Sequence, residues 1–316
     1  MPQISVIVLT YNPNPVQLRQ TLAAITAQLG VDLEIIISDD GSSKKDFSFL
    51  STYMDSLNAK NYRLLEHTTN HGTVANCLSA VKTAMGKYIF FTSPGDLLFD
   101  EYVLRDFYQF AEQNHTPLCF GNAVFYHLTT EGPKITREFG TPAHPQLYKS
   151  GTSLSQNKTA FFGGNWVIGA SYFRSKDIAL KYLEKISDSS VYMEDTPSTA
   201  FALANGLRLC YFDRNIVWYE DGSGVSTSSN NKWELLLKKD LQRSLSTLKA
   251  HYPANPYVDV AYRNATIDNR IKRILGNLLH HPIIMLRLTF YKRYPSKPIT
   301  YNEADLLRLN QLLKTI

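Results

Sequence analysis

The segment SVIVLTYN, residues 5–12, joins a strand signal to a turn signal within eight residues. Residues 4–9 are almost all β-branched or aliphatic, which is typical of a strand buried on both faces. Residues 10–13 read Thr-Tyr-Asn-Pro and are turn-forming, so they end the strand. We therefore predict a buried strand near the first residue that opens into a loop at Thr10.

Helix and strand signals alternate after this loop. Leu18, Leu22, Ile25 and Leu29 recur at helical spacing, and Gly30 is typical of a helix end. The expected series is a strand at 4–9, a helix ending at Gly30, strands at 33–38 and 62–66, a helix that carries Met85 and ends at Gly86, and a strand at 88–91. Such alternation predicts an α/β fold with a parallel sheet, whose ligand site lies beyond the carboxyl ends of the strands.

The bulk composition limits the partners. With 316 residues and 44% hydrophobic side chains, the chain can bury one large α/β domain and an appendage. The net charge of +5 favours an anionic partner, such as a phosphate-bearing substrate or an acidic membrane surface. That charge is too small to indicate nucleic acid, and no nucleic-acid recognition motif accompanies it. Cys77, Cys119 and Cys210 show neither metal-ligand nor disulfide spacing.

Three segments together resemble one family. They are SVIVLTYN at 5–12, EIIISDDGSS at 34–43 and NHGTVANCLSAVKTAMGKYI at 70–89. In content, order and spacing they resemble the opening of the family 2 inverting glycosyltransferases of the GT-A fold. The resemblance implies an α/β protein with a GT-A fold, a Rossmann-like, doubly wound mixed sheet that binds a nucleotide-sugar donor.

The resemblance extends over about residues 3–228. We predict a GT-A domain at 1–228, with a nucleotide-binding half at 1–98 and an acceptor and catalytic half at 99–228. Residues 229–316 are read as a basic, helical C-terminal extension.

The resemblance assigns a nucleotide site to the strand ends. Tyr11 would stack on the base and Asp40 would accept a hydrogen bond from a pyrimidine ring N–H, so we expect UDP. Asp39 either faces the ribose or fixes the turn, and Asn76 either shapes the site or is buried structure. The nucleotide-sugar set is Thr10, Tyr11, Asn12, Asp39, Asp40, Ser42, Asn70, Gly72, Asn76, Ser93 and Asp96.

The family's usual metal loop is altered here. Members commonly carry an Asp-x-Asp motif whose oxygens hold Mg²⁺ or Mn²⁺ against the donor diphosphate. In this chain Ser93 and Gly95 stand where acids would, and Asp96 alone remains. Asp96 either is the sole protein ligand of a divalent cation, contacts sugar hydroxyls directly, or caps the following helix. Glu220 and Asp221 are either replacement ligands or solvated loop acids.

A second signal lies at 191–209, VYMEDTPSTAFALANGLRL, which resembles the family's Glu-Asp helix. The resemblance implies that Asp195 is the base that takes the proton of the acceptor hydroxyl, with Glu194 orienting acceptor or donor. Alternatively, both acids merely favour the positive end of the helix dipole. Residues 215–226, NIVWYEDGSGVS, resemble a closing strand and a Gly-rich loop that folds over the diphosphate, with Ser226 at its end.

The acceptor side is less clearly marked. Residues 163–174, GGNWVIGASYFR, resemble the strand and turn that lead to the acceptor wall. We predict that Asn165 and Trp166 face the acceptor, a hydroxyl of a glycan, a lipid-linked glycan or a glycoprotein, with core packing as the alternative for Trp166. Residues 129–164 are rich in Pro, Gly, Ser and Thr and are predicted to be an irregular acceptor loop.

The C-terminal part mixes apolar and basic residues at 270–294. This stretch either lies on an anionic membrane surface or packs as helices on the catalytic domain or on a second copy in a homodimer. A capping box at Thr300 and Glu303 is predicted to start the final helix. Neither a secretory signal nor an apolar run of about 18 residues is visible. We therefore expect a cytoplasmic chain, either soluble or peripheral at the inner face of the membrane.

One rival to the enzyme hypothesis remains open. Because Ser93 and Gly95 replace the usual acids, the chain could be a catalytically weakened, nucleotide-sugar-binding partner of a glycosyltransferase complex. The presence of Glu194 and Asp195 favours the enzyme.

Overall fold

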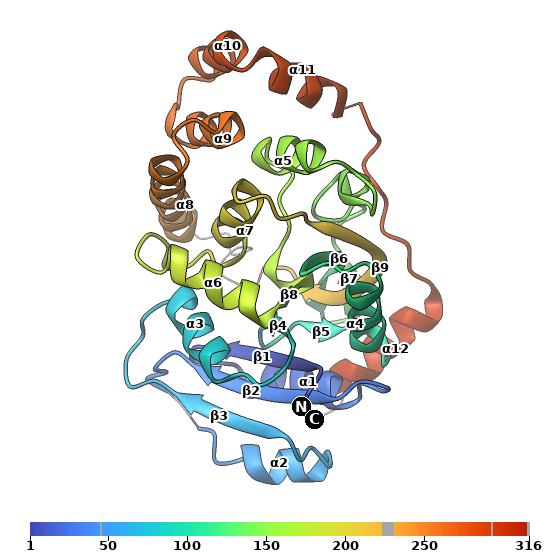
Figure 1. Ribbon diagram of the computed structural model, residues 1–316. Coiled ribbons are helices and arrows are strands. Elements are labelled where there is room, and N and C mark those ends of the chain that lie inside the picture. The colour runs from blue at the N-terminus through green and yellow to red at the C-terminus, as the bar shows by residue number, and fades with distance from the viewer. Residues whose placement is uncertain (45, 223–230, 292, 315–316) are drawn as a thin grey trace.

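A computed structural model describes residues 1–44, 46–222, 231–291 and 293–314 (Figure 1). Its strands are β1 (Ile4–Thr10), β2 (Leu33–Asp39), β3 (Tyr62–Glu66), β4 (Tyr88–Thr92), β5 (Leu97–Leu98), β6 (Leu118–Thr129), β7 (Gly132–Ile135), β8 (Tyr172–Ser175) and β9 (Cys210–Glu220). All belong to one sheet in the order β3-β2-β1-β4-β8-β6-β9-β5, with β7 paired to β6. Helices cover both faces of this sheet.

The strand predicted at residues 4–9 lies near the middle of the parallel part of the sheet. It pairs in parallel with β2 on one side and with β4 on the other. Ile4, Val6, Ile7 and Val8 are 0% exposed, because neighbouring strands cover both edges and helices cover both faces. The apolar run therefore reads as predicted.

The two early helices end sooner than predicted. They are α1 (Pro15–Thr26) and α3 (Thr73–Thr83), and Leu29 and Met85 beyond them are about half exposed. The Leu29 N–H donates to the carbonyl of Glu101, and the Met85 N–H donates to the carboxylate of Glu34. Tertiary partners thus take the amides that a longer helix would use.

The sheet becomes mixed beyond β4. Strand β8 is antiparallel to both β4 and β6, while β6 and β9 are parallel to each other. The helices of this half are α4 (Val103–Gln113), α6 (Lys176–Ile186) and α7 (Asp195–Ala204), and α2 (Leu50–Ser56) follows β2 in the first half. This doubly wound mixed sheet agrees with the predicted fold class.

The predicted irregular loop at 129–164 is largely structured. It contains β7, the short 3₁₀ helix η1 (Pro145–Tyr148) and α5 (Leu154–Phe162). Ser153 caps α5 by accepting a hydrogen bond from the Gln156 N–H at 3.1 Å. The buried Asn157 side chain binds both the Leu147 carbonyl and the Leu209 N–H. Polar residues that suggest a loop therefore serve here as a cap and as a buried tie.

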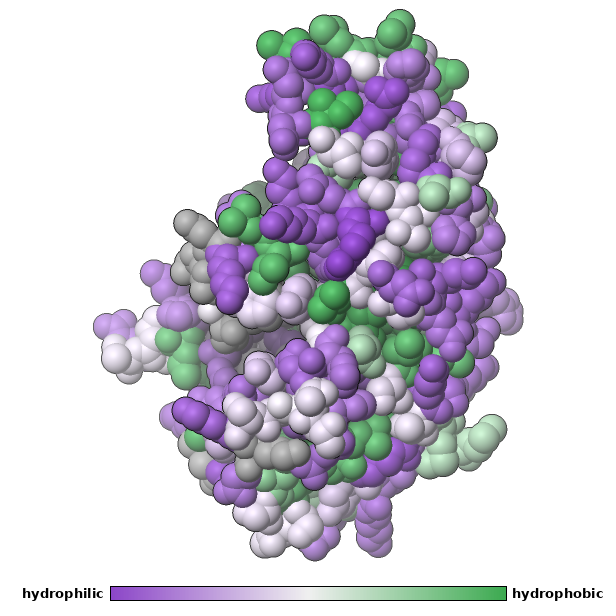
Figure 2. All heavy atoms as spheres, turned by 90° about the vertical axis from the view of Figure 1, so that its left-hand side faces the viewer, coloured by the Kyte–Doolittle hydropathy of each residue, from purple (hydrophilic) through white to green (hydrophobic). Residues whose placement is uncertain are grey.

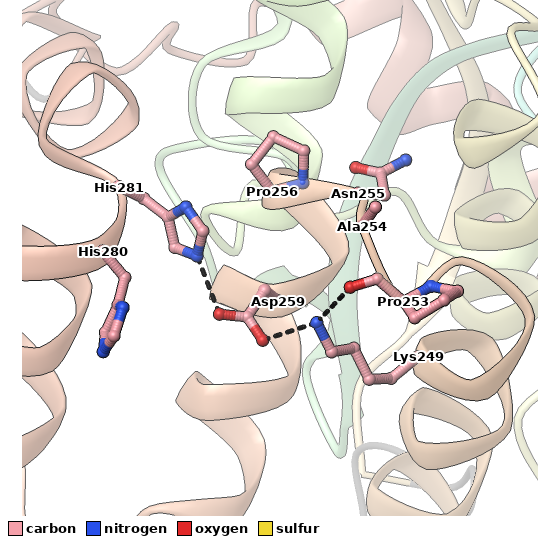
Figure 3. A pocket seen from close by; sticks show the side chains of 8 residues that line it. All are labelled: Lys249, Pro253, Ala254, Asn255, Pro256, Asp259, His280 and His281. Carbon is pink, nitrogen blue, oxygen red and sulfur yellow. Dashed lines mark hydrogen bonds and ion pairs between the residues drawn. The ribbon is translucent and has the colours of Figure 1, made fainter.

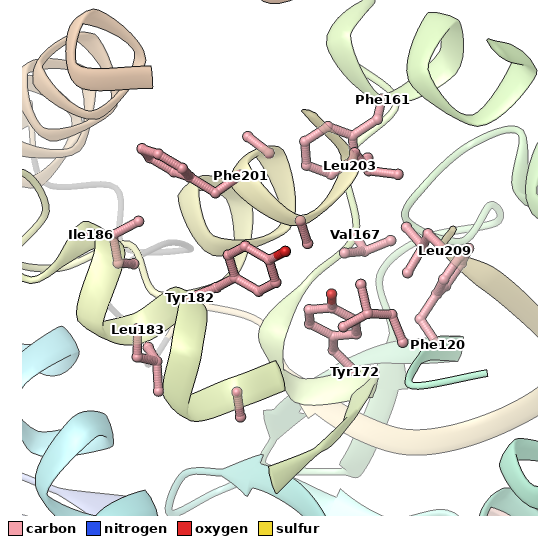
Figure 4. Close-up of a cluster of buried hydrophobic side chains, with 14 of the residues drawn as sticks. Phe120, Phe161, Val167, Tyr172, Tyr182, Leu183, Ile186, Phe201, Leu203 and Leu209 are labelled. Atoms are coloured by element: carbon pink, nitrogen blue, oxygen red, sulfur yellow. The ribbon is translucent and has the colours of Figure 1, made fainter. Parts of the chain in front are cut away.

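Helices α5, α6 and α7 share a core with one face of the sheet. Figure 4 shows Phe161, Tyr182, Phe201 and Leu203 from these helices in the same buried cluster as Tyr172 of β8. All five side chains are at most 3% exposed. This packing makes the start of α7, where Glu194 and Asp195 lie, a rigid part of the molecule.

The C-terminal part is helical, as predicted. It comprises α8 (Asn231–His251), α9 (Pro256–Thr266), α10 (Arg270–His280), α11 (Pro282–Tyr291) and α12 (Glu303–Lys314). In Figure 1, α10 and α11 lie at the end of the molecule opposite β3, whereas α12 returns to the first half beside α1. Gln20 on α1 donates to the Leu313 carbonyl at 2.6 Å. None of the described helices has the length and hydropathy needed to cross a bilayer.

The capping box of α12 is not the predicted one. The Asp305 N–H donates to the Asn302 side chain at 3.0 Å, and the Asn302 N–H donates to the Asp305 carboxylate at 2.9 Å. This reciprocal pair is two residues C-terminal to the predicted pair, Thr300 and Glu303. The Thr300 carbonyl instead accepts a hydrogen bond from Asn215 on β9. Asn and Asp thus fill the two capping positions.

Candidate active site

The turns after β1 and β2 are tied together by Asp39. Its carboxylate accepts hydrogen bonds from the Thr10 hydroxyl at 3.1 Å, and from the Ser42 hydroxyl at 2.5 Å and backbone N–H at 2.9 Å. The Ser42 hydroxyl in turn accepts from the Asn12 N–H at 2.6 Å. Asp39 is 0% exposed, so in this structure it fixes the turn. Tyr11, between these residues, is 53% exposed at the strand end.

Asp40 holds the start of α3. Its two carboxylate oxygens accept from the backbone N–H groups of His71 and Gly72, each at 2.9 Å. Burial raises the pKa of Asp40, and these two hydrogen bonds oppose that rise. Asn70, next to this pair, is exposed. The carboxylate therefore shapes the loop that leads into α3.

Asn76 is a structural residue of the same region. Its side chain is 3% exposed and pairs with Ser38 on β2, through the Ser38 hydroxyl at 2.5 Å and the Ser38 carbonyl at 3.0 Å. Of the two roles predicted for Asn76, the structure places it in buried packing. Ser93, by contrast, is exposed at the end of β4.

Asp96 and Glu220 form a carboxyl pair where β4 and β9 end. Asp96 is 8% exposed, and burial raises its pKa to about 8, helped by the nearby charge of Glu220 and opposed by hydrogen bonds from the Ser93 and Glu220 backbone. The Glu220 carboxylate packs against Gly95 and accepts from the Gln17 amide at 2.5 Å. A side chain at position 95 would fill the space that Glu220 occupies.

This pair suits a hard divalent cation. Carboxylate oxygens are the ligands that Mg²⁺ and Mn²⁺ prefer, and such ions often take one or two protein carboxylates plus substrate phosphates. Among the described residues, His, Cys, Asp and Glu side chains nowhere gather in threes as metal ligands. Asp221 lies outside the pair, because its carboxylate is bound by Thr136 and Arg137, each at 3.0 Å.

Glu194 is a buried carboxylate with a buried partner. It is 7% exposed, and its Oε2 lies 2.6 Å from Nη1 of Arg174 on β8, which is 2% exposed. Burial raises the pKa of Glu194, the Arg174 charge opposes that rise, and Asp195 adds to it. The Arg174 guanidinium also lies 4.2 Å from the centre of the Tyr172 ring. The ion pair fixes the side chain next to Asp195.

Asp195 is the more accessible of the two acids and begins α7. Its Oδ2 accepts from the Gly169 N–H at 2.9 Å, and its Oδ1 accepts from the N–H of Thr196 at 2.5 Å. A Cβ at position 169 would overlap Glu194, so the absence of a side chain lets this backbone approach both acids. A carboxylate at a helix start, oriented by backbone N–H groups, is a suitable proton acceptor.

The segment before α7 is held by Asp240 on α8, which the sequence did not predict. Its carboxylate accepts from the N–H groups of Val191 at 2.9 Å, Tyr192 at 2.8 Å and Met193 at 3.1 Å. Although burial alone would raise the pKa of Asp240, these bonds lower it. Asp240 shares its helix face with Leu241, Ser244 and Leu248. An acid on such a largely apolar face is the sequence signal that could have identified Asp240 as a buried, functional residue.

The same segment joins the two halves of the predicted site. The Val74 N–H on α3 donates to the Val191 carbonyl at 3.0 Å, and Gly72, at φ +91°, lies against Val191. Burial raises the pKa of the Cys77 thiol on α3, and the charges of Glu194, Asp195 and Asp40 raise it further. Asp40, Glu194 and Asp195 therefore lie around one helix, α3.

The predicted acceptor residues are partly structural. The Asn165 side chain exchanges two hydrogen bonds with the backbone of His144, at 3.1 and 3.2 Å. Trp166 is partly buried against the core of α5, α6 and α7. Ser226 lies outside the described residues.

A cavity among the C-terminal helices contains none of the predicted site residues. Figure 3 shows it between α8, α9 and the α10–α11 junction, with Asp259 at its centre. Asp259 binds Lys249 at 2.8 Å, and Arg263 and His281 each at 2.7 Å. These contacts lower the pKa of Asp259 against the effect of its burial. The Asp259 cluster therefore holds α8, α9 and the α10–α11 junction together, and it includes no residue predicted for the donor or acceptor site.

Comparison with curated proteins finds two named glycosyltransferases. An uncharacterized glycosyltransferase of Haemophilus influenzae is 30% identical over 135 residues, 43% of this chain and 52% of that protein. This chain thus matches about half the length of that relative. An uncharacterized glycosyltransferase of Methanocaldococcus jannaschii is 24% identical over 79% of this chain and 80% of that protein.

Comparison with solved structures supports the fold. S. aureus TarS 1–349 in complex with UDP-GlcNAc superposes with a TM-score of 0.57 and 15% identity, over 99% of this chain and 90% of that one. The mannosyltransferase PcManGT from Pyrobaculum calidifontis, in complex with GDP-Man and Mn²⁺, gives a TM-score of 0.58 and 16% identity, over 94% and 76%. Both share the mixed α/β architecture described above.

The family model provides the assignment. Glycosyl transferase family 2 matches residues 5–176, which is more than half of the chain and includes the segments at 5–12, 34–43 and 70–89. Together with the GT-A-like sheet, this match identifies the protein as a member of glycosyl transferase family 2.

Proposed function

We propose that this glycosyltransferase is an inverting enzyme that moves a hexose or N-acetylhexosamine from a UDP-sugar to a hydroxyl group of a glycan acceptor. One observation carries the proposal. The Glu194–Asp195 pair is tied to the start of α3 through Val191, beside the loop that Asp40 shapes. A proton acceptor and a nucleotide loop thus stand close together, as direct displacement requires.

The donor is proposed to bind across the ends of β1, β2 and β4. Tyr11 offers an exposed ring to the base, and Asp40 keeps lone pairs for a pyrimidine N–H beyond those that hold α3. The Asp40 carboxylate, as a hydrogen-bond acceptor for a pyrimidine N–H, favours a UDP-sugar. The TarS structure contains UDP-GlcNAc and the PcManGT structure contains GDP-Man, so both nucleotides belong in the test.

A divalent cation is proposed to bind at Asp96 and Glu220. When bound, Mg²⁺ or Mn²⁺ would neutralise charge on the donor diphosphate. In its absence Asp96 holds a proton near neutral pH, because its pKa is about 8. The pair thereby replaces the acids missing at Ser93 and Gly95.

The transfer is proposed to be one displacement. The acceptor hydroxyl oxygen attacks the anomeric carbon, its proton passes to the Asp195 carboxylate, and the bond from that carbon to the diphosphate oxygen breaks, releasing UDP. Attack from the face opposite the diphosphate inverts the anomeric configuration. Arg174 pairs with the neighbouring Glu194, and the Gly169 N–H orients the Asp195 carboxylate. The acceptor is a glycan, a lipid-linked glycan or a glycoprotein.

A donor panel tests this proposal. The native chain and a glycan, lipid-linked or glycoprotein acceptor fraction are incubated with UDP-glucose, UDP-galactose, UDP-GlcNAc, UDP-GalNAc or GDP-Man, with and without Mn²⁺, and release of the nucleoside diphosphate is measured. We expect release from at least one UDP-sugar, greater with Mn²⁺. For the donor that reacts, proton NMR of the glycoside product should give the anomeric configuration opposite to that of the donor.

Two outcomes would contradict the proposal. Retention of the anomeric configuration excludes single displacement. If calorimetry detects UDP-sugar binding but no donor is turned over with any glycan, lipid-linked or glycoprotein acceptor fraction, the chain is a donor-binding partner rather than the catalyst.

A further inference from the structure

Helix α10 carries its apolar side chains on the outside. Ile271, Ile274, Leu275, Leu278 and Leu279 recur at helical spacing and are 39–79% exposed. The face turned toward the protein is polar instead. Asn277, 1% exposed, donates to the Asn264 side chain at 3.0 Å, and Arg273 donates to the carbonyl groups of Asn264 and Ile267. This orientation is the reverse of that expected for a helix on a globular surface.

Helix α11 continues the same surface. Ile283, Leu286 and Phe290 are 52–66% exposed and share one face, while Ile284 is buried on the other. Leu288 packs against Gly163 at the end of α5, so the inner face of α11 is already occupied. We call these eight side chains the outer apolar stripe: Ile271, Ile274, Leu275, Leu278, Leu279, Ile283, Leu286 and Phe290. In Figure 2 hydrophobic side chains gather along the top of the molecule, the end where α10 and α11 lie in Figure 1.

The segment that carries the stripe has basic side chains and no acidic ones. Residues 270–294 contain no Asp or Glu. Arg270 and Lys272 are exposed at the start of α10, and Arg293 is exposed just past α11, with its guanidinium 5.4 Å from the centre of the Phe290 ring. Basic groups therefore stand at both ends of the stripe.

Contacts with α9 and α5 fix the position of α10 and α11. His281, at their junction, binds Asp259 on α9, and Arg287 on α11 binds Ser155 on α5. The exposed stripe is thus part of the packed structure.

We propose that the outer apolar stripe and its flanking basic residues form a peripheral docking surface for an anionic lipid bilayer. At about 1.5 Å per residue, helices of 10 and 11 residues are roughly 16 Å long, half the hydrocarbon thickness of a bilayer, so they lie along the interface. Apolar side chains enter the acyl boundary and Arg270, Lys272 and Arg293 meet the headgroups. A second copy of the chain would bring like charges together, whereas an anionic bilayer has the complementary sign.

Flotation of the full-length chain with lipid vesicles tests this surface, and the test needs no donor or acceptor. The vesicles contain phosphatidylcholine alone or phosphatidylcholine mixed with phosphatidylglycerol. We expect binding to the mixed vesicles that falls as salt is raised. In the variant Leu275→Glu/Leu279→Glu, the partition coefficient should fall about tenfold for each leucine. In Arg270→Ser/Lys272→Ser it should fall about fivefold for each charge.

Leu307→Glu is the matched control, because Leu307 is 64% exposed on α12 at the other end of the molecule. It should bind as the native chain does, and all variants should keep the native circular dichroism spectrum. The inference is overturned if the native chain fails to float with the mixed vesicles, or if the double glutamate variant floats as well as Leu307→Glu. It is also overturned if light scattering gives a native dimer that the double glutamate variant abolishes while vesicle binding stays unchanged.

Discussion

At the scale of single residues, the site depends on how a few buried charges are paired. Glu194 and Arg174 are both almost inaccessible to water, and their side chains form an ion pair at 2.6 Å. Burial raises the pKa of both Glu194 and Asp96, but the Arg174 charge opposes that rise at Glu194, whereas the Glu220 charge adds to it at Asp96. At Glu194 an ion pair offsets the cost of burying the carboxylate, whereas at Asp96 that cost appears as a raised pKa.

Removal of Arg174 should destabilise the protein strongly. Arg174→Gln leaves the Glu194 carboxylate buried without its partner, which typically costs about 3–5 kcal/mol of unfolding free energy. The double variant Arg174→Gln/Glu194→Gln should recover part of that loss, because no unpaired charge remains. Urea denaturation measures both values. If the single variant is as stable as the double variant, the ion pair does not hold the site.

Asp96 should make stability depend on pH. Its folded-state pKa of about 8 lies above the unfolded value of 3.8, so its contribution is fully present below about pH 4 and is lost as pH rises toward 8. The slope is at most about 1.4 kcal/mol per pH unit. Asp96→Asn should flatten the curve of unfolding free energy against pH between 4 and 8. An unchanged curve would mean that Asp96 is ionised throughout.

At the scale of elements, the candidate active site is assembled by contacts between segments far apart in the chain. Strand β8 supplies Arg174, α7 supplies Asp195, and α8 supplies Asp240, which lies in the predicted C-terminal extension. The extension therefore contributes directly to the site through the 191–193 backbone.

The variant Asp240→Asn should lower turnover, although residue 240 is not proposed to contact the substrate. An amide offers one acceptor oxygen and brings N–H donors toward the N–H groups of Val191, Tyr192 and Met193, so the segment before Asp195 loses its anchor. We expect an unfolding free energy lower by about 2 kcal/mol and a reduced kcat. Asp268→Asn, at an exposed acid, is the control. A native kcat in Asp240→Asn would contradict this role.

At the scale of the whole molecule, the last helix, α12, packs against the first elements of the chain. Leu309 of α12 is 0% exposed and belongs to the core that covers β1, β4 and α1. Arg308 on the same helix binds Glu101. The first and last elements of the chain thus share one core.

Leu309→Ala should therefore weaken the entire fold. Deleting a fully buried leucine side chain typically costs about 2–5 kcal/mol. Leu307→Ala, on the exposed side of the same helix, should cost less than about 0.5 kcal/mol. Thermal unfolding compares the two variants. Equal melting temperatures would mean that α12 is not part of the core.

The sequence predicts the first half of the molecule well, because its signals are local. The apolar run at 4–9 can be recognised by its residue types, and the acids at 39–40 by their position after a strand. Arg174 could not be found in this way, since its role depends on a tertiary partner 20 residues away. Asp240 offered a local signal, an acid on an apolar helix face, but its partners lie about 50 residues away and could not be predicted. Residues 129–164 were misread for a related reason: Ser153 and Asn157 look like loop residues but cap and tie a helix.

The role of Asp195 is tested most directly by separating donor binding from turnover. The native chain, Asp195→Asn and Asp188→Asn are compared, where Asp188 is an exposed acid seven residues upstream. We predict that Asp195→Asn binds the donor with a native Kd in calorimetry but releases UDP with a kcat lower by about 10²–10⁴-fold, while Asp188→Asn matches the native chain in both. If Asp195→Asn releases UDP at the native rate, Asp195 is not the base and the account of this site is wrong.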